Sequence, residues 1–135
     1  MLRLEIAALY CGVNILLLLV LAYLVTSGRR KHKITLGDGG HEGMSRAIRA
    51  HANAAEYIPA GLVGIVVLSL FESLPMWVLH AGGISLTLGR LLHAWGLHTS
   101  AFNQGRVAGA ALSWLSYLII GVALIYVGVG HQLGG

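Results

Sequence analysis

The sequence has few charged residues. Only 10% of its 135 residues are Asp, Glu, Lys or Arg, whereas about a quarter of the residues of a typical soluble domain are charged. Hydrophobic residues make up 56% of the chain. They lie in runs of about 18 residues or more, which is the length of a membrane span, rather than at the spacing of an amphipathic helix. This composition excludes a water-soluble globular domain and leaves no segment for a sizeable extramembrane one.

Cysteine is nearly absent as well. The single Cys11 lies inside the first apolar run, so an intrachain disulfide is excluded, and we interpret this residue as a packing residue. The same run is roughly 20 residues long, against about 7–15 for the core of a signal peptide, and no small-residue cleavage site precedes a soluble domain. We therefore expect the first run to be retained as a helix.

Four apolar segments follow one another along the chain, at about residues 5–27, 46–71, 75–97 and 105–130. Each is long enough, at about 1.5 Å per helical residue, to cross a hydrocarbon core of about 30 Å. Lipid offers no partner for an open backbone, so each is expected to be a helix. The only long connection, residues 28–45, contains the loop signature Gly37-Asp38-Gly39-Gly40. The sequence predicts an all-α integral membrane protein, a single domain over residues 1–135 folded as an up-down bundle of four transmembrane helices.

Basic residues are concentrated beside the first apolar segment. Six of the nine Lys and Arg residues fall in one stretch of 21 residues, namely Arg29, Arg30, Lys31, Lys33, Arg46 and Arg49. Next to a hydrophobic span, such a cluster indicates topology and contact with lipid headgroups rather than a nucleic-acid site. We expect the first and third loops to face the cytoplasm and both termini to lie outside. The short loops and the lack of a retention signal favour a bacterial inner membrane.

The second segment carries a polar face. Arg49, Asn53 and Glu56 are spaced i, i+4 and i+7, which places them on one side of a helix, with Tyr57 beside them. Charged groups inside a span cost about 2.5–3.5 kcal/mol each, so they tend to mark function. The alternative is an Arg–Glu pair that only stabilises a kink at Pro59.

The antiparallel helix order brings further cations to the same membrane side. Arg90 and His93 lie near the end of the third segment, and Arg106 begins the fourth. The groups expected to meet there are Arg30, Arg49, Arg90 and Arg106, with His51, Asn53, Glu56, Tyr57 and His93 among them. Four guanidinium groups against one carboxylate require an anionic ligand. Arginine suits carboxylates or phosphates and Glu56 suits an ammonium, so a ligand with carboxylates and an amino group would satisfy both.

Two of these features have simpler readings. Arg29 and Arg30 by themselves are typical topology determinants. Gly105 and Gly109 form a small-xxx-small pair, which serves either packing within the chain or contact between chains.

The pattern Arg49-x-x-x-Asn53-x-x-Glu56-Tyr57-x-Pro59, supported by Arg90, His93 and Arg106, resembles the MAPEG family, the membrane-associated proteins in eicosanoid and glutathione metabolism. This family includes microsomal glutathione transferases and the glutathione-using leukotriene and prostaglandin synthases. The likeness covers nearly the whole chain in the same four-helix order. It implies a homotrimer whose active sites lie between subunits, in the cytoplasmic half of the bundle.

The resemblance also implies roles for individual residues. Glutathione would be bound by Arg30, Arg49, His51, Asn53, Glu56, Tyr57, Arg90 and His93. Arg106 matches the catalytic arginine beside the glutathione sulfur, where a cation favours the nucleophilic thiolate. The second substrate would be a lipophilic electrophile that enters from membrane lipid.

The chain departs from some relatives at three positions. Leu97 stands where some have a tyrosine, and Val107 and Ala110 stand where the prostaglandin-forming members have Ser and Tyr. Conjugation for detoxification, or a glutathione peroxidase activity, is therefore expected rather than the prostaglandin reaction.

Two other functions stay open. One is a non-catalytic membrane protein that binds lipid or glutathione, and the other is a small transporter or structural bundle. Arg106 and the polar face from Arg49 to Glu56 favour the enzyme, while the gathering of polar groups at one membrane side disfavours a pore. Neither a nucleic-acid partner nor a bound metal is expected.

Overall fold

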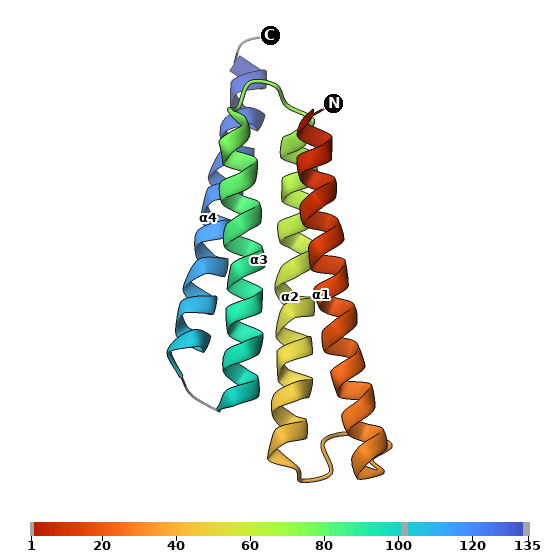
Figure 1. Cartoon of the computed structure of the whole chain (residues 1–135). Coiled ribbons are helices and arrows are strands. Elements are labelled where there is room, and N and C mark those ends of the chain that lie inside the picture. The colour runs from red at the N-terminus through yellow and green to blue at the C-terminus, as the bar shows by residue number, and fades with distance from the viewer. Residues whose placement is uncertain (1, 101–102, 134–135) are drawn as a thin grey trace.

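The computed structural model describes residues 2–100 and 103–133, with side chains up to residue 130. Four helices run alternately up and down: α1 (Leu2–His32), α2 (Glu42–Ser69), α3 (Met76–Thr99) and α4 (Gln104–Leu133). The start of α1 and the end of α4 lie at the same end of the bundle, opposite the α1–α2 connection (Figure 1). Among the described residues there is no strand, and α1 packs on α2 and α3 but not on α4. The predicted up-down order of four helices is confirmed.

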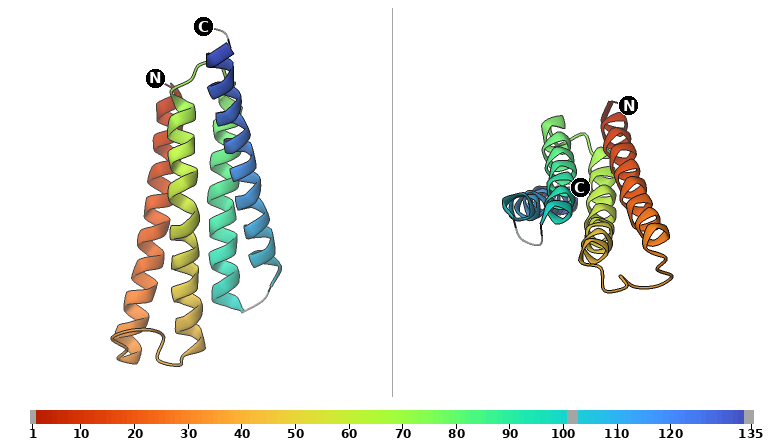
Figure 2. Two further views of the ribbon diagram at one scale, coloured as in Figure 1. Left: turned by 180° about the vertical axis from the view of Figure 1, so that it is seen from behind. Right: turned by 60° about the horizontal axis from the view of Figure 1, so that its bottom comes forward.

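Three of the helices are long and apolar enough to cross a membrane, namely α1, α2 and the part of α4 from Gln104 to Gly130. The chain is thus a membrane protein. Helix α3, which we predicted as a fourth span, is not among the described helices that meet this criterion. It carries His80, Arg90, His93 and His98, which lower its hydropathy, and 12 of its 24 residues are buried against the other three helices. Helix α3 lies between α4 and the pair formed by α1 and α2 (Figure 2), and half of its residues are buried there.

The first helix extends further than the sequence predicted. It continues through Arg29 to His32 because basic side chains are stabilised by the negative end of the helix dipole. It ends at His32, and the next residue, Lys33, has a left-handed φ of 56°; the N–H of Ile34 donates to the carbonyl of Arg29 at 2.9 Å. The connection is thus shorter than the predicted 28–45, although its glycines at 37, 39 and 40 have positive φ as the loop signature indicated. Helix α2 likewise begins four residues before the predicted position 46.

Glycines let α3 and α4 approach closely in the half of the bundle that holds the arginines. A Cβ atom added to Gly109 would lie 2.4 Å from the backbone nitrogen of His93 and 2.6 Å from the carbonyl oxygen of Gly89. No larger residue fits there without moving backbone. For Gly109, the structure therefore supports packing within the chain over contact between chains.

The opposite half of the bundle is held by a large apolar core and a few polar contacts. The Tyr10 hydroxyl and His80 Nδ1 are 2.9 Å apart, and Asn14 Nδ2 donates to Thr87 Oγ1 at 2.8 Å, so α1 is fixed against α3. The guanidinium of Arg3 donates to the carbonyls of Glu72 and Leu74 in the α2–α3 turn. This half of the bundle is therefore structural, and the candidate site lies in the other half.

Candidate functional site

A buried arginine on α3 forms the centre of the site. Arg90 is only 1% exposed. Its Nε donates to Ser113 Oγ at 2.8 Å, its Nη2 donates to the carbonyl of Gly109 at 3.2 Å, and its Nη1 donates to Asn53 Oδ1. The guanidinium carbon lies 4.5 Å from the centre of the Tyr57 ring. Arg90 therefore joins α2, α3 and α4.

All of these partners of Arg90 are neutral. Within the described part of the chain, no carboxylate lies within ion-pair distance of its guanidinium. Removing a cation from water costs several kcal/mol. Hydrogen bonds to a charged donor return about 1.5–3 kcal/mol each, and the ring face adds about 0.5–2 kcal/mol. The charge of Arg90 is thus solvated by dipoles but not neutralised, and it leaves a positive potential at the site.

The polar face of α2 lies beside this cation. Arg49 Nη1 is 3.4 Å from Glu56 Oε1, and Asn53 Nδ2 is 3.5 Å from Glu56 Oε2. Both distances are at the upper limit for a hydrogen bond. The side chains of Arg49 and Glu56 are 58% and 53% exposed. The i, i+4, i+7 spacing does place the three side chains together, and the carboxylate retains acceptor capacity for a further partner.

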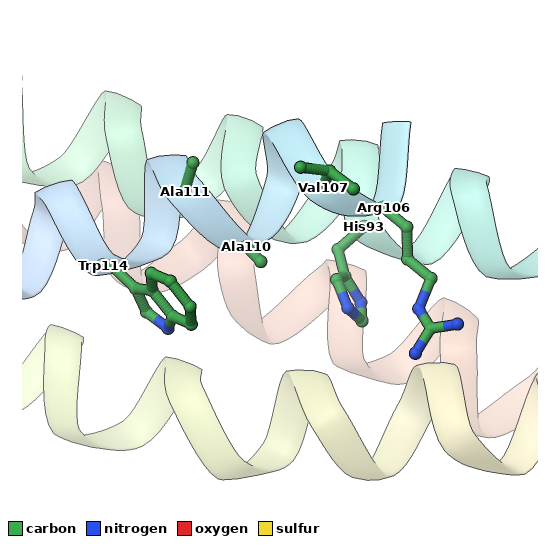
Figure 3. Close-up of a pocket in the computed structure, with 6 residues that line it drawn as sticks. All are labelled: His93, Arg106, Val107, Ala110, Ala111 and Trp114. Carbon is green, nitrogen blue, oxygen red and sulfur yellow. The ribbon is translucent and has the colours of Figure 1, made fainter. Parts of the chain in front are cut away.

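A cavity of about 340 Å³ lies next to the arginines, along the start of α4. It is lined by His93, Arg106, Val107, Ala110, Ala111 and Trp114 (Figure 3). In Figure 3 the side chains of His93, Arg106 and Trp114 all point away from α4 toward α2. Trp114 of this lining donates a hydrogen bond to the Tyr57 hydroxyl on α2, so the cavity and the polar face of α2 belong to one site. We call it the inner pocket: cationic at Arg106, apolar toward Trp114.

The position of Arg106 is fixed by the residue that caps α4. Asn103 Oδ1 accepts a hydrogen bond from the backbone N–H of Arg106 at 3.0 Å, while Asn103 Nδ2 donates to the carbonyl of Gly96 at 2.8 Å. Side chains of this kind satisfy the free N–H groups of a helix start. The first turn of α4 is thereby attached to the last turn of α3, and Arg106 is held beside His93.

Two hydrogen bonds join α4 to α2 just beyond this pocket. Trp114 Nε1 donates to the Tyr57 hydroxyl at 3.1 Å, and the Tyr117 hydroxyl donates to the backbone carbonyl of Tyr57 at 2.7 Å. The Tyr57 and Tyr117 rings are 5.5 Å apart. Sequence reasoning missed Ser113, Trp114 and Tyr117, although Ser113 and Tyr117 stand i, i+4 as polar groups inside an apolar run and could have indicated the inward face of α4.

The structure brings seven of the nine predicted site residues into one region, namely Arg49, Asn53, Glu56, Tyr57, Arg90, His93 and Arg106. The other two, Arg30 and His51, do not join them within one chain. Arg30 is exposed near the end of α1, and His51 stands two residues from Arg49, on another face of α2. Neither side chain bonds to the cluster in the described part of the chain, so their roles stay predictions. Among the described residues, no group of three or more His, Cys, Asp or Glu is arranged to hold a metal ion.

Comparison with known proteins identifies the family of the chain and named relatives. Residues 7–126 match the sequence profile of the MAPEG family. The chain is 33% identical over 121 residues to the inner membrane protein YecN of Escherichia coli strain K12, and the alignment covers 90% of this chain and 91% of the relative. The same values hold for YecN of E. coli O6:H1 strain CFT073. The name YecN states a membrane location and no activity.

Proposed function

The chain belongs to the MAPEG family, and from this membership and the charge of its site we propose that it is a membrane-bound glutathione transferase of a bacterial inner membrane. The observation that carries the proposal is the buried guanidinium of Arg90, which has only neutral partners among the described residues. Arg49 and Arg106 add two more cations close by, against the single carboxylate of Glu56 in this cluster as far as the structure describes it. An anionic ligand would neutralise this excess.

Glutathione has the matching charges, since it carries two carboxylates and one ammonium. Arginine binds carboxylates through parallel N–H donors, and Arg49 is exposed enough to reach one. The loosely held carboxylate of Glu56 suits the ammonium. A ligand that engages both ends of this face replaces the weak Arg49–Glu56 pair with stronger contacts.

Arg106 would act on the sulfur. The thiol proton leaves to water, and the thiolate electron pair forms a C–S bond with the electrophilic carbon while the leaving group departs with its bonding pair. A nearby cation stabilises the thiolate, and each unit by which the thiol pKa falls corresponds to about 1.4 kcal/mol. The apolar wall of the inner pocket, Val107 and Ala110 with Trp114, would hold the lipophilic electrophile beside that sulfur.

A lipid hydroperoxide is an alternative electrophile at the same site. The thiolate would attack the distal oxygen, the O–O bond would break, and the alcohol would leave after protonation. A second glutathione would then convert the sulfenic acid to the disulfide and water.

We further propose a homotrimer with the site between subunits. Arg49 and Glu56 are half-exposed on the surface of a helix that is apolar enough to span a membrane, and lipid solvates charges poorly. A neighbouring copy would cover this face, and the exposed Arg30 is free to approach such a neighbour's site. The basic α1–α2 connection favours the cytoplasm for this end of the bundle. Chemical cross-linking in native membranes tests the trimer directly.

The function is tested by calorimetry of glutathione binding to the detergent-purified protein, with an ultraviolet scan for thiolate absorbance. S-methylglutathione, which has no thiol, is the matched control because it should bind without the absorbance change. Binding of glutathione with a thiolate signal at neutral pH is the expected result. Binding without that signal would indicate a receptor rather than an enzyme. Absence of binding would mean that the arginines serve only membrane topology and packing.

A further inference from the structure

The inner pocket is one of two cavities along α4, and its lining residues come from α3 and α4. The second cavity, of about 290 Å³, lies farther along α4, at its contact with α2, and includes Gly61 and Gly64 from α2 and Ile120 and Leu124 from α4 in its lining. We call it the outer groove. With the exception of Tyr117, its lining residues are apolar, and the small residues of α2 make room for it.

The hydrogen bond between Trp114 and Tyr57 lies between the two cavities. On α4, Arg106 and Ala110 of the inner pocket precede Trp114, while Ile120 of the outer groove follows it. On α2, Tyr57 comes one turn before Gly61. Trp114 lines the inner pocket but not the outer groove. Its indole Nε1 lies 3.1 Å from the hydroxyl oxygen of Tyr57 on α2. The indole therefore stands as the wall between the inner pocket and the outer groove.

Trp114 contributes little to the core of the bundle. It is 63% exposed, so its size is not required to fill the interior. A buried indole N–H usually donates one hydrogen bond, and here the acceptor is the hydroxyl of Tyr57. The Arg90 guanidinium packs over the ring of the same tyrosine. A large, flat side chain fixed in this way limits the space beside it.

We propose that Trp114 is the residue that determines substrate length, because its indole closes the inner pocket and excludes electrophiles with long apolar tails. This inference rests on the proposed transferase function. The eight helical steps from Arg106 to Trp114 span about 12 Å at about 1.5 Å per step. An electrophile whose reactive carbon lies beside Arg106 therefore has roughly that length available. Without the indole, the inner pocket would continue into the outer groove, and longer tails would fit.

Binding of S-alkylglutathiones of increasing chain length tests this without requiring turnover. Calorimetry on the detergent-purified wild type should show affinity that rises with short tails and falls once the tail exceeds about 12 Å. Trp114→Ala should bind the long-tailed analogues at least about tenfold more tightly than wild type, because a pocket that gains or loses room discriminates by roughly 10–200-fold. Trp114→Phe, which loses the hydrogen bond but keeps a ring, should give an intermediate limit.

Trp77→Ala is the matched control. Trp77 is 66% exposed at the start of α3 and lines neither cavity, so its loss should leave the length limit unchanged and should correct for partitioning of long tails into detergent. An unchanged limit in Trp114→Ala, or a uniform loss of affinity at every length, would overturn the role of Trp114 while S-methylglutathione still binds. Failure of wild type to bind even S-methylglutathione would instead overturn the proposed function, and this inference with it.

Discussion

Removing the Ser113 hydroxyl should show how much the stability of the bundle depends on the hydrogen bonds to the buried guanidinium of Arg90. Ser113 is fully buried, accepts the Nε–H of Arg90 at 2.8 Å and donates to the carbonyl of Gly109 at 2.9 Å. Ser113→Ala would leave a guanidinium N–H without a partner in an apolar interior. Because the donor is charged, we expect a loss of about 1.5–3 kcal/mol in the free energy of unfolding.

Ser116→Ala provides a control on the same helix. Ser116 is also fully buried and also bonds across to α3, but its partner is the neutral carbonyl of Gly82 at 2.8 Å. Hydrogen bonds of this kind between membrane helices average about 0.6 kcal/mol. The two variants delete the same atom at equal burial, so the difference between them, about 1–2 kcal/mol, reports the charge of Arg90.

The assay is reversible unfolding of the purified protein in mixed micelles, followed by circular dichroism, with glutathione calorimetry on both variants. Ser113→Ala should be the less stable of the two and should bind glutathione several-fold more weakly, because Arg90 loses the contact that orients it over Tyr57. Equal stability and equal affinity of the two variants would refute the idea that Ser113 serves the charge of Arg90.

Three further substitutions test the site and its scaffold. Arg106→Ala should preserve the oligomer and sharply lower kcat/KM for conjugation at neutral pH, and unchanged turnover would remove the role of Arg106 in stabilising the thiolate. Glu56→Gln should weaken glutathione binding about tenfold, or about 1.4 kcal/mol, and an unaltered affinity in calorimetry would mean that Glu56 only pairs with Arg49. Gly109→Ala should lower the free energy of unfolding by about 1–3 kcal/mol, because its Cβ would lie 2.4 Å from the nitrogen of His93. Gly128→Ala on the same helix, with no atom within 4 Å of the added Cβ, should not, so equal losses would contradict this account of the α3–α4 contact.

The number and order of the helices could be read from the sequence because long apolar runs have few alternatives. Their ends were less accurate, and α1 is the main example. Residues 29–32 looked like a polar connection, yet basic side chains are favoured at the negative end of a helix, so α1 continues through them. Charge alone could not separate a loop from a stabilised helix terminus.

The candidate site was predictable on α2 and much less so on α4. The spacing of Arg49, Asn53 and Glu56 defines one helical face whatever the neighbours are. Which helix that face meets depends on how each helix is rotated, and the sequence does not contain that rotation. Ser113 and Trp114 therefore became visible as partners of Arg90 and Tyr57 only in the folded chain.

The close approach of Gly89 and Gly109 determines which parts of the molecule can move. Where two backbones touch with no side chain between them, the helices cannot slide or separate without a steric clash or loss of contact. Helices α3 and α4 therefore form one rigid unit that carries Arg90, His93 and Arg106 with it. Because α1 is bonded to α3 as well, any widening of the α2–α4 contact to admit a ligand requires α2 to shift against the other helices. The two hydrogen bonds that α4 donates to Tyr57 hold α2 in place, so such a shift would have to break both of them.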